Sequence, residues 1–257
     1  MVRGLFTAWT GLETEQKRLD VIANNMANSA TVGFKAENVT NQSFKNVLTL
    51  KINDSSEGFI DRPIGNMSLG TKLGEVYTDY SQGSLKETGN DFDVALNGKG
   101  FFAVNVIDAK GNESIRYTRD GSFTMDKEGY IVDCYGNHVQ SESGDIQIPT
   151  DATHITIDID GSIYADDQYI DKILVVDFED YDYLSKYADN MYQTIDGAVQ
   201  IDAQGSIIQG YTEQSNVNVI SEMVQMINIT RAYEANQKVM QTIDSSLDQV
   251  VNTVGKV

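Results

Sequence analysis

The feature that most constrains the fold is an apolar repeat of helical spacing at each end of the chain, which is nearly absent from the middle. Up to about residue 28, apolar side chains recur at alternating steps of three and four residues. From about residue 216 to 254 the spacing returns, broken by two consecutive steps of three. Such steps place side chains on one face of an α-helix, so both ends are predicted to be long amphipathic helices.

Large side chains dominate the predicted seams of both helices. The N-terminal seam includes Leu5, Trp9, Leu12, Leu19 and Met26, and the C-terminal seam includes Met223, Met226, Tyr233, Met240, Ile243, Leu247 and Val250. Poor helix formers, among them Asn24, Asn25 and Asn28, gather near the end of the first helix, and Gly33 comes soon after them. The first helix is therefore expected to end there, with an extended segment through Phe34.

The middle of the chain has the pattern of an all-β domain. Short alternating runs closed by Gly or Asn follow one another, with candidate core strands at 100–104, 154–159 and 172–178. The predicted fold class is α+β, a central all-β domain flanked by long terminal amphipathic helices that pair as a coiled coil. The predicted regions are an N-terminal helix at 1–30, an extended linker at 31–69, the β-rich domain at 70–211 and a C-terminal helix at 212–257.

The length of the C-terminal helix predicts an oligomer. At about 1.5 Å per residue it would extend for more than about 50 Å, well beyond what a small β domain can cover. Pairing with the N-terminal helix would still leave Ile22 and Ile227 off the seams. Apolar surface on both sides of a helical pair is expected to be buried between subunits.

Charge and composition exclude several classes of protein. With 38 Asp and Glu against 19 Lys and Arg, the formal net charge is −19, so a nucleic-acid partner is not expected. Neither a cleaved signal peptide nor a membrane-spanning run is expected, because polar residues interrupt the N-terminal segment. The single cysteine, Cys134, cannot form an intrachain disulfide and is expected to be a small buried residue.

An enzyme is the main alternative from another class. His138 and His154 lie in no nucleophile or metal motif, and the aspartates between Asp158 and Asp171 are interpreted as solvated turn charges. Residues 97–100 lack the spacing of a phosphate-binding loop. No catalytic residue, metal site or cofactor is therefore predicted, although a secreted hydrolase or adhesin with a β domain remains a second hypothesis.

Several motifs resemble those of one family along nearly the whole chain. Leu19–Asn28 followed by Gly33-Phe34-Lys35 is similar to the N-terminal signature of flagellar rod and hook proteins. Further motifs in the same order include residues 82–90, 93–102, 117–123 and 215–217, and the C-terminal helix contributes residues 222–227 and 231–236, which include Asn236. Asp91-Phe92 stands where the family commonly has a Pro-Leu pair. This departure bears on the subtype within the family, rod or hook-type, and not on family membership.

The resemblance implies a structural subunit of the bacterial flagellar basal-body rod that polymerises through its terminal helices, with a hook-type protein as the alternative. It implies copies of itself, other rod and hook proteins and the flagellar type III export apparatus as partners, and a place in the basal body. The residues expected in the assembly interface are the seam residues named above with Ile22, Asn24, Asn25, Asn28, Gly33, Phe34, Ile227 and Asn236.

Overall fold

The structure is a computed structural model that describes residues 2–51, 62–107, 111–152, 154–188 and 190–254. The chain forms two compact units, each built from segments that are far apart in the sequence. Residues 1–26, 37–79 and 218–257 make the helical unit, and residues 27–36 and 80–217 make the β unit. The predicted linker at 31–69 includes residues 52–61, which lie outside the described residues.

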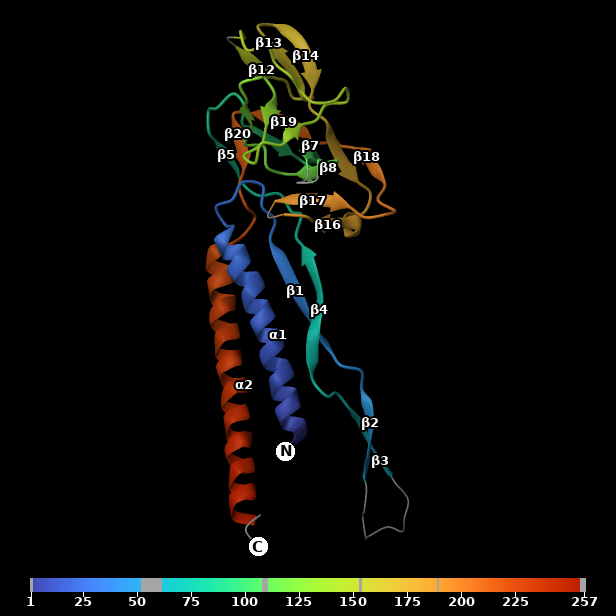
Figure 1. Cartoon of the computed structure of the whole chain (residues 1–257), viewed down its shortest axis with the longest axis vertical. Coiled ribbons are helices and arrows are strands. Elements are labelled where there is room, and N and C mark those ends of the chain that lie inside the picture. Colours follow the sequence, from blue (N-terminus) through green and yellow to red (C-terminus); the bar gives the residue numbers. More distant parts are fainter. Residues whose placement is uncertain (1, 52–61, 108–110, 153, 189, 255–257) are drawn as a thin grey trace. The chain divides into compact units, whose positions relative to one another are not determined.

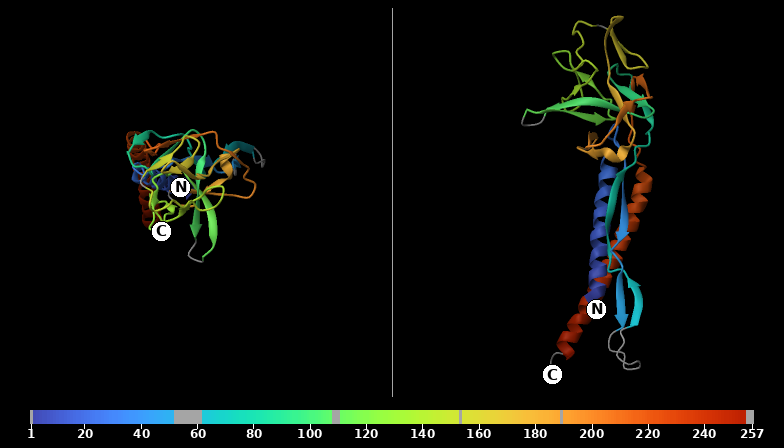
Figure 2. Two further views of the ribbon diagram at one scale, coloured as in Figure 1. Left: turned by 90° about the horizontal axis from the view of Figure 1, so that it is seen from above. Right: turned by 90° about the vertical axis from the view of Figure 1, so that its right-hand side faces the viewer.

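Two long helices dominate the helical unit (Figures 1 and 2), α1 at Val2–Ala27 and α2 at Val219–Val254. Asn218 fixes the start of α2, because its side-chain oxygen accepts hydrogen bonds from the backbone N–H groups of Ile220 and Ser221 at 3.1 and 3.2 Å. After α1, Gly33 adopts a φ of 69°, where a glycine is favoured. The two terminal helices and the β-rich centre agree with the predicted α+β class.

The rest of the helical unit is a two-stranded ribbon. Strand β1 (Glu37–Ser43) pairs antiparallel with β4 (Thr71–Thr78), and β2 (Val47–Lys51) pairs antiparallel with β3 (Arg62–Met67). Strands β1, β2 and β3 fall within the segment predicted as an extended linker at 31–69. Pairing satisfies backbone hydrogen-bonding groups that an isolated extended segment would leave to water, and it brings β4 into the helical unit.

The largest sheet of the β unit is antiparallel and includes nine strands among the described residues. Its path runs β16 (Leu184–Lys186), β17 (Met191–Thr194), β8 (Glu113–Thr118), β7 (Phe101–Ile107), β11 (His138–Val139), β10 (Ile131–Val132) and β9 (Thr124–Met125). Off this path, β15 (Val175–Phe178) pairs with both β7 and β18 (Gln200–Asp202).

Smaller sheets complete the β unit. Strands β12 (Ile155–Ile157), β13 (Ser162–Ala165) and β14 (Gln168–Lys172) form a three-stranded sheet, and a short 3-10 helix, η1 (Tyr181–Tyr183), follows β15. Strand β19 (Ser206–Gln209) pairs with β6 (Val94–Asn97), and β20 (Tyr211–Glu213) pairs with β5 (Leu85–Glu87).

Strand β7 separates the two hydrophobic clusters of the β unit. Phe102 and Val104 belong to the larger cluster, whereas Phe101 and Ala103 belong to the smaller one. Successive side chains of a strand point to opposite faces, so β7 is covered on both sides. The predicted core strand at 100–104 is thus confirmed as part of β7.

Two local predictions in the β unit require correction. Cys134 is exposed, because the chain turns at Asp133–Gly136 instead of continuing β10. Ile159 is exposed as well, whereas Ile155 and Ile157 of the same predicted strand are buried. Strand β12 ends at Ile157, and the turn that follows carries Ile159 out of the alternation.

Candidate functional site

Two glycines of α1 allow the long helices to approach each other closely. A Cβ added at Gly4 would lie 3.3 Å from Cδ1 of Ile243, and one at Gly11 would lie 3.0 Å from Nδ2 of Asn236. Seven residues forward along α1 thus match seven residues backward along α2, so the helices run antiparallel (Figure 1). On α1 a glycine stands at each of these two contacts, and on α2 the partners are Ile243, a predicted seam residue, and Asn236. Glycine lets the two backbones approach closely.

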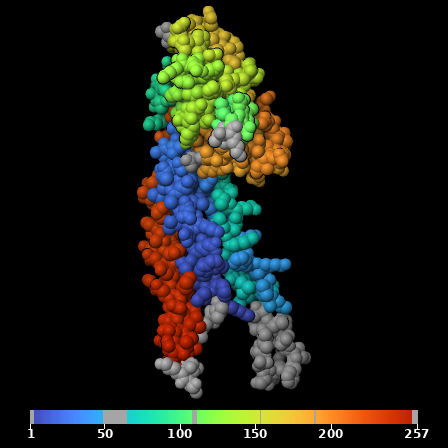
Figure 3. All heavy atoms as spheres, viewed as in Figure 1, coloured from blue at the N-terminus to red at the C-terminus, as the bar shows by residue number. Residues whose placement is uncertain are grey.

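Most of the predicted assembly-interface residues fall into two groups by exposure. The half-buried group consists of Leu5, Leu12, Leu19, Met26, Asn28, Met226, Tyr233, Asn236, Met240, Ile243 and Leu247. Those that are exposed are Trp9, Asn24, Met223, Ile227 and Val250. Figure 3 shows the surfaces of α1 and α2 side by side. The exposed side chains of the second group are open to contact from outside the chain.

Other predicted interface residues are buried within the subunit. Ile22, Asn25, Gly33 and Phe34 each have little or no exposed surface. Asn25 uses its amide inside the helical unit: Nδ2 donates to the carbonyl of Glu37 at 2.8 Å, and Oδ1 accepts from the N–H of Glu37 at 3.0 Å. This side chain satisfies both backbone groups of Glu37 and thereby ties the end of α1 to the start of β1.

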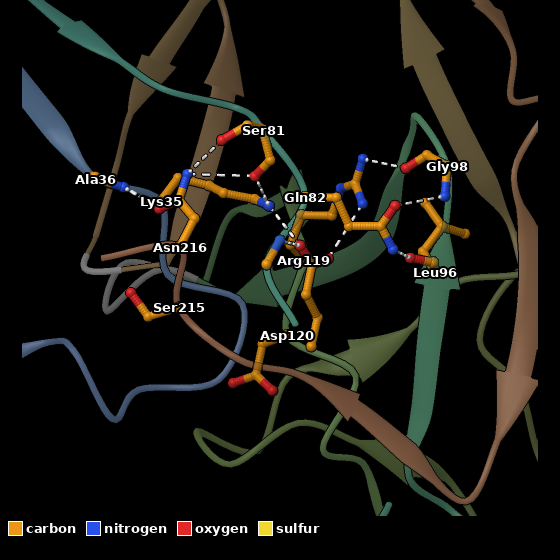
Figure 4. Close-up of polar contacts among 12 residues, drawn as sticks. Lys35, Ala36, Ser81, Gln82, Leu96, Gly98, Arg119, Asp120, Ser215 and Asn216 are labelled. Carbon is orange, nitrogen blue, oxygen red and sulfur yellow. Dashed lines mark hydrogen bonds and ion pairs between the residues drawn. The ribbon is translucent and has the colours of Figure 1, made fainter. Parts of the chain in front are cut away.

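A charged cluster is buried in the β unit (Figure 4). Lys35 donates from Nζ to Oε1 of Glu213 at 2.5 Å and to the carbonyl of Ser81 at 2.8 Å. Arg119 donates from Nη1 to Oε2 of Glu213 at 3.2 Å and from Nη2 to the carbonyl of Gly98 at 2.8 Å. We call Lys35, Arg119 and Glu213 the buried clasp.

The buried clasp joins segments that are distant in the sequence. Glu213 also accepts a hydrogen bond from the N–H of Gly83 at 2.8 Å, and its backbone carbonyl accepts one from Gly33. Next to Lys35, the N–H of Ala36 donates to Oδ1 of Asn216 at 2.8 Å. Removing charged groups from water is costly unless they are paired and hydrogen-bonded, and here each has partners. The clasp therefore holds residues 33–36 within the β unit.

Gly33 and Phe34 seat this segment against the sheet. A Cβ at Gly33 would lie 2.4 Å from the backbone nitrogen of Asp120, so only glycine fits. Phe34 has no exposed surface, and Nζ of Lys186 lies 4.7 Å from the centre of its ring. Both residues were predicted as interface residues, and their observed contacts are with the β unit of their own chain.

Sequence reasoning did not assign a role to the acid of the buried clasp. Glu213 stands between the predicted strand region and the Ser215-Asn216-Val217 motif, and nothing in its local spacing marks it. One signal in the sequence could have pointed to a buried acid. Lys35 and Arg119 each lie in a motif that resembles those of rod and hook proteins. Two cations in such motifs of an acidic chain suggest a buried acidic partner.

The residues considered for catalysis are not gathered into one site. His138 contacts Asp145 through Nδ1 at 2.7 Å and stacks on Tyr130, whereas the backbone N–H of His154 donates to Asp166. Among the described residues, no group of three or more His, Cys, Asp or Glu could hold a metal ion. In the same part of the chain, no helix combines the length and apolar character that a bilayer crossing requires.

Three family models match successive parts of the chain. Residues 5–35 match the model for flagella basal body rod protein, and residues 95–165 match the model for the flagellar hook protein FlgE/F/G D1 domain. Residues 208–253 match the model for the flagellar basal body rod FlgEFG protein C-terminal region. The matches appear in chain order and cover both long helices and part of the β unit.

Curated relatives are similar along almost their whole length. Flagellar basal-body rod protein FlgG of Buchnera aphidicola subsp. Schizaphis graminum is 35% identical, over 97% of this chain and 99% of the relative. FlgG of Bacillus subtilis is 34% identical, over 98% and 99%, and flagellar basal-body rod protein FlgF of Caulobacter vibrioides is 32% identical, over 100% of both.

These relatives confirm the predicted family and class of function. The family consists of structural components of the flagellum and is not an enzyme family, and its members assemble with other rod and hook proteins. A structural flagellar rod subunit is the function that this similarity supports. The chain belongs to the flagellar basal-body rod protein family.

Proposed function

We propose that this chain polymerises through α1 and α2, with copies of itself and with neighbouring rod and hook proteins, into the helical tube of the rod. The observation that carries the proposal is the apolar surface left on the helical unit. Phe6 and Trp9 on α1, and Ile220, Met223, Val224 and Ile227 on α2, are each about half exposed or more. Burying such surface between subunits is favourable by about 25 cal/mol per Å².

The internal pairing of the helices forms part of the same proposal. Along each helix, the residues that face the other helix follow steps of three and four. The two helices can therefore pair as an antiparallel coiled coil. In the polymer this pair supplies the rigid element, and the exposed residues Trp9, Met223, Ile227 and Val250 supply contacts between copies. The other predicted interface residues stabilise the fold of the subunit that carries these exposed residues.

The isolated subunit is expected to have less stable helices than the polymer. A long helix with one face uncovered gains little from tertiary packing, and ordering each residue costs about 1 to 2 kcal/mol. Hydrogen exchange on dilute monomer and on polymer measures this difference. Equal, strong protection of residues 5–26 and 223–250 in both states would contradict the proposal.

Export completes the proposed role: the subunit crosses the cytoplasmic membrane through the flagellar type III apparatus without a cleaved signal peptide. The N-terminal residue and mass of protein recovered from isolated basal bodies test this directly. An intact N-terminal segment supports the proposal, whereas a truncated N-terminus contradicts it. A rod position is proposed in preference to a hook-type position because the relatives described above are rod proteins.

Complementation in a deletion strain tests the assembly role. The strain receives the full chain or a version that lacks residues 217–257, and basal bodies are viewed by electron microscopy. Rods that stop short without the gene, and are restored only by the full chain, are expected. Normal flagella in the deletion strain would overturn the proposal, and complete rods without hooks would favour the hook-type position.

A further inference from the structure

We infer that the contact between copies is staggered: α1 of one copy packs its first three turns against the first three turns of α2 in the next copy. This inference rests on the proposed function and specifies its contact. The two surfaces are Phe6 and Trp9, called the α1 patch, and Ile220, Met223, Val224 and Ile227, called the α2 patch.

The α1 patch points away from α2. Gly4 and Gly11 face α2 at contact distance, and Phe6 and Trp9 each stand two residues from one of them. Two residues turn about 200° around an α-helix, so Phe6 and Trp9 lie on the opposite side of α1. Their exposed fractions of 57% and 53% agree with this placement.

The α2 patch points away from α1 by the same reasoning. Glu222 and Ile229 are buried, and Glu222 lines a small pocket together with Arg18 and Ile22 of α1. Ile220 and Val224 stand two residues on either side of Glu222, and Ile227 stands two residues before Ile229. The two patches therefore lie on opposite faces of the helix pair.

The patches also lie at opposite ends of the pair. Because Gly4 faces Ile243 and Gly11 faces Asn236, Met223 at the centre of the α2 patch lies beside the region of Asn24 on α1. That region is about 16 residues beyond the α1 patch, which is about 24 Å along the axis at 1.5 Å per residue. A copy shifted by this length brings its α1 patch beside the α2 patch of its neighbour.

Charge favours this register over an unshifted one. Arg3 is the only charged residue in 2–12, and Glu222, which faces α1, is the only one in 219–229. An unshifted neighbour would instead place the α2 patch beside the part of α1 that carries Asp20 and Asn24. In a chain of net charge −19, apolar contact between segments almost free of carboxylates avoids the general repulsion.

Opposite faces also determine how many neighbours each copy needs. One neighbour cannot cover both patches, so a closed two-fold dimer leaves one patch exposed in each copy. A contact between unlike surfaces repeats without limit unless the rotation closes a ring. The patches therefore specify growth in one direction along the helix axis.

Photo-crosslinking in assembled rods tests the register. Trp9 is replaced by p-benzoylphenylalanine, an aromatic residue of similar bulk, in the full chain, and a 1:1 mixture of isotopically light and heavy copies identifies links between copies. The expected links join position 9 to residues 219–229 of another copy. The same probe at Lys17, in the charged half of α1, is expected to give at least fivefold fewer links to that segment.

A pair of matched substitutions provides a second readout. Ile227→Asp lies within the α2 patch, and Val239→Asp lies outside it on the same helix, with exposed fractions of 53% and 50%. Ile227→Asp is expected to raise the critical concentration for polymerisation at least tenfold, and Val239→Asp less than threefold. Circular dichroism of both monomers checks that each variant is folded.

The outcomes separate the register from the proposed function. Links from position 9 to residues 238–241 or to α1 of another copy, or equal effects of the two substitutions, would overturn the staggered contact while leaving assembly intact. Failure of the unmodified chain to enter any rod or polymer would overturn the proposed function, and the contact with it.

Discussion

Asn190 donates a hydrogen bond from Nδ2 to Oδ2 of Asp120 at 2.9 Å, while its own side-chain oxygen is buried with no hydrogen-bond partner among the described residues. On its other oxygen, Asp120 accepts from the backbone N–H and the hydroxyl of Ser122 at 3.0 and 2.5 Å. Burial raises the pKa of Asp120 despite these bonds, with the nearby charge of Asp133 contributing in the same direction.

The Asp120→Asn variant is expected to lose little stability near neutral pH. Rotation of the Asn190 amide by half a turn would let its free oxygen accept from the new amide, so the bond survives. Because the folded pKa is raised, the stability that protonation provides is complete below about pH 3.9 and is lost as pH rises through the folded value. The variant should therefore improve relative to the parent chain as pH increases from about 4.

Urea unfolding at several pH values measures this trend, and Asp244→Asn, at an exposed position on α2, serves as the control. A difference between parent and Asp120→Asn that stays constant with pH would contradict the assignment. So would a loss of about 3 kcal/mol or more at pH 7, because that is the scale for a buried polar group left without its bond.

Lys35→Met should destabilise the β unit by about 3 to 5 kcal/mol, since it leaves a buried carboxylate with fewer partners. Glu213→Gln should cost a similar amount, because Lys35 and Arg119 would then share no anion. The exposed pair Lys17 and Glu13, 3.0 Å apart on α1, is the control, and Lys17→Met should cost no more than about 1 kcal/mol. Chemical denaturation followed by tyrosine fluorescence gives the comparison, and equal costs would refute a structural role for the buried clasp.

Asn25→Asp should destabilise the helical unit by about 2 to 3 kcal/mol, because a carboxylate oxygen would replace the amide that donates to the Glu37 carbonyl. Its exposed neighbour provides a control of the same chemistry, and Asn24→Asp should change stability by no more than about 0.5 kcal/mol. Faster hydrogen exchange at the N–H of Glu37 in the first variant alone would locate the effect. Similar losses of stability in Asn25→Asp and Asn24→Asp would instead attribute the effect to the negative charge added at the end of α1.

Gly33→Ala isolates the effect of close backbone approach. Gly33 and Gly89 have nearly equal φ values, 69° and 72°, but a Cβ at Gly89 would meet no atom within 4 Å. Gly89→Ala should cost about 1 to 2 kcal/mol from conformation alone, and Gly33→Ala a further 1 to 3 kcal/mol from overpacking against Asp120. Thermal unfolding of both variants checks the difference. Equal midpoints would show that the backbone around Gly33 can shift away from Asp120 at little cost in stability.

The sequence predicts the secondary structure of the ends well because helical periodicity is a local property. The first helix was expected to reach about residue 28 and ends at Ala27, and the second was expected from about 216 and starts at Val219. Which face pairs is harder to predict. Glycines carry no apolar signal, so Gly4 and Gly11 were overlooked in favour of larger residues such as Trp9.

Pairings between distant segments were the least predictable part. The bond from Lys35 to Glu213 spans 178 residues, and no local pattern encodes a contact of that separation. The same holds for the pairing of β1, which lies in the predicted extended linker, with β4, which lies beyond it. Asn25 is a similar case: its place near the end of the first helix is visible in the sequence, but no local pattern identifies Glu37 as its partner.

The presence of residues 27–36 in the β unit has a practical consequence for anyone who wishes to express that unit alone. A gene fragment that begins at residue 80 would encode every strand of the largest sheet but would lack Phe34 and Lys35. The buried position of the Phe34 ring would then be empty, and Glu213 would lose the partner that Lys35 provides. An autonomous fragment must carry both pieces, for example residues 27–36 joined by a short glycine-rich connector to residues 80–217.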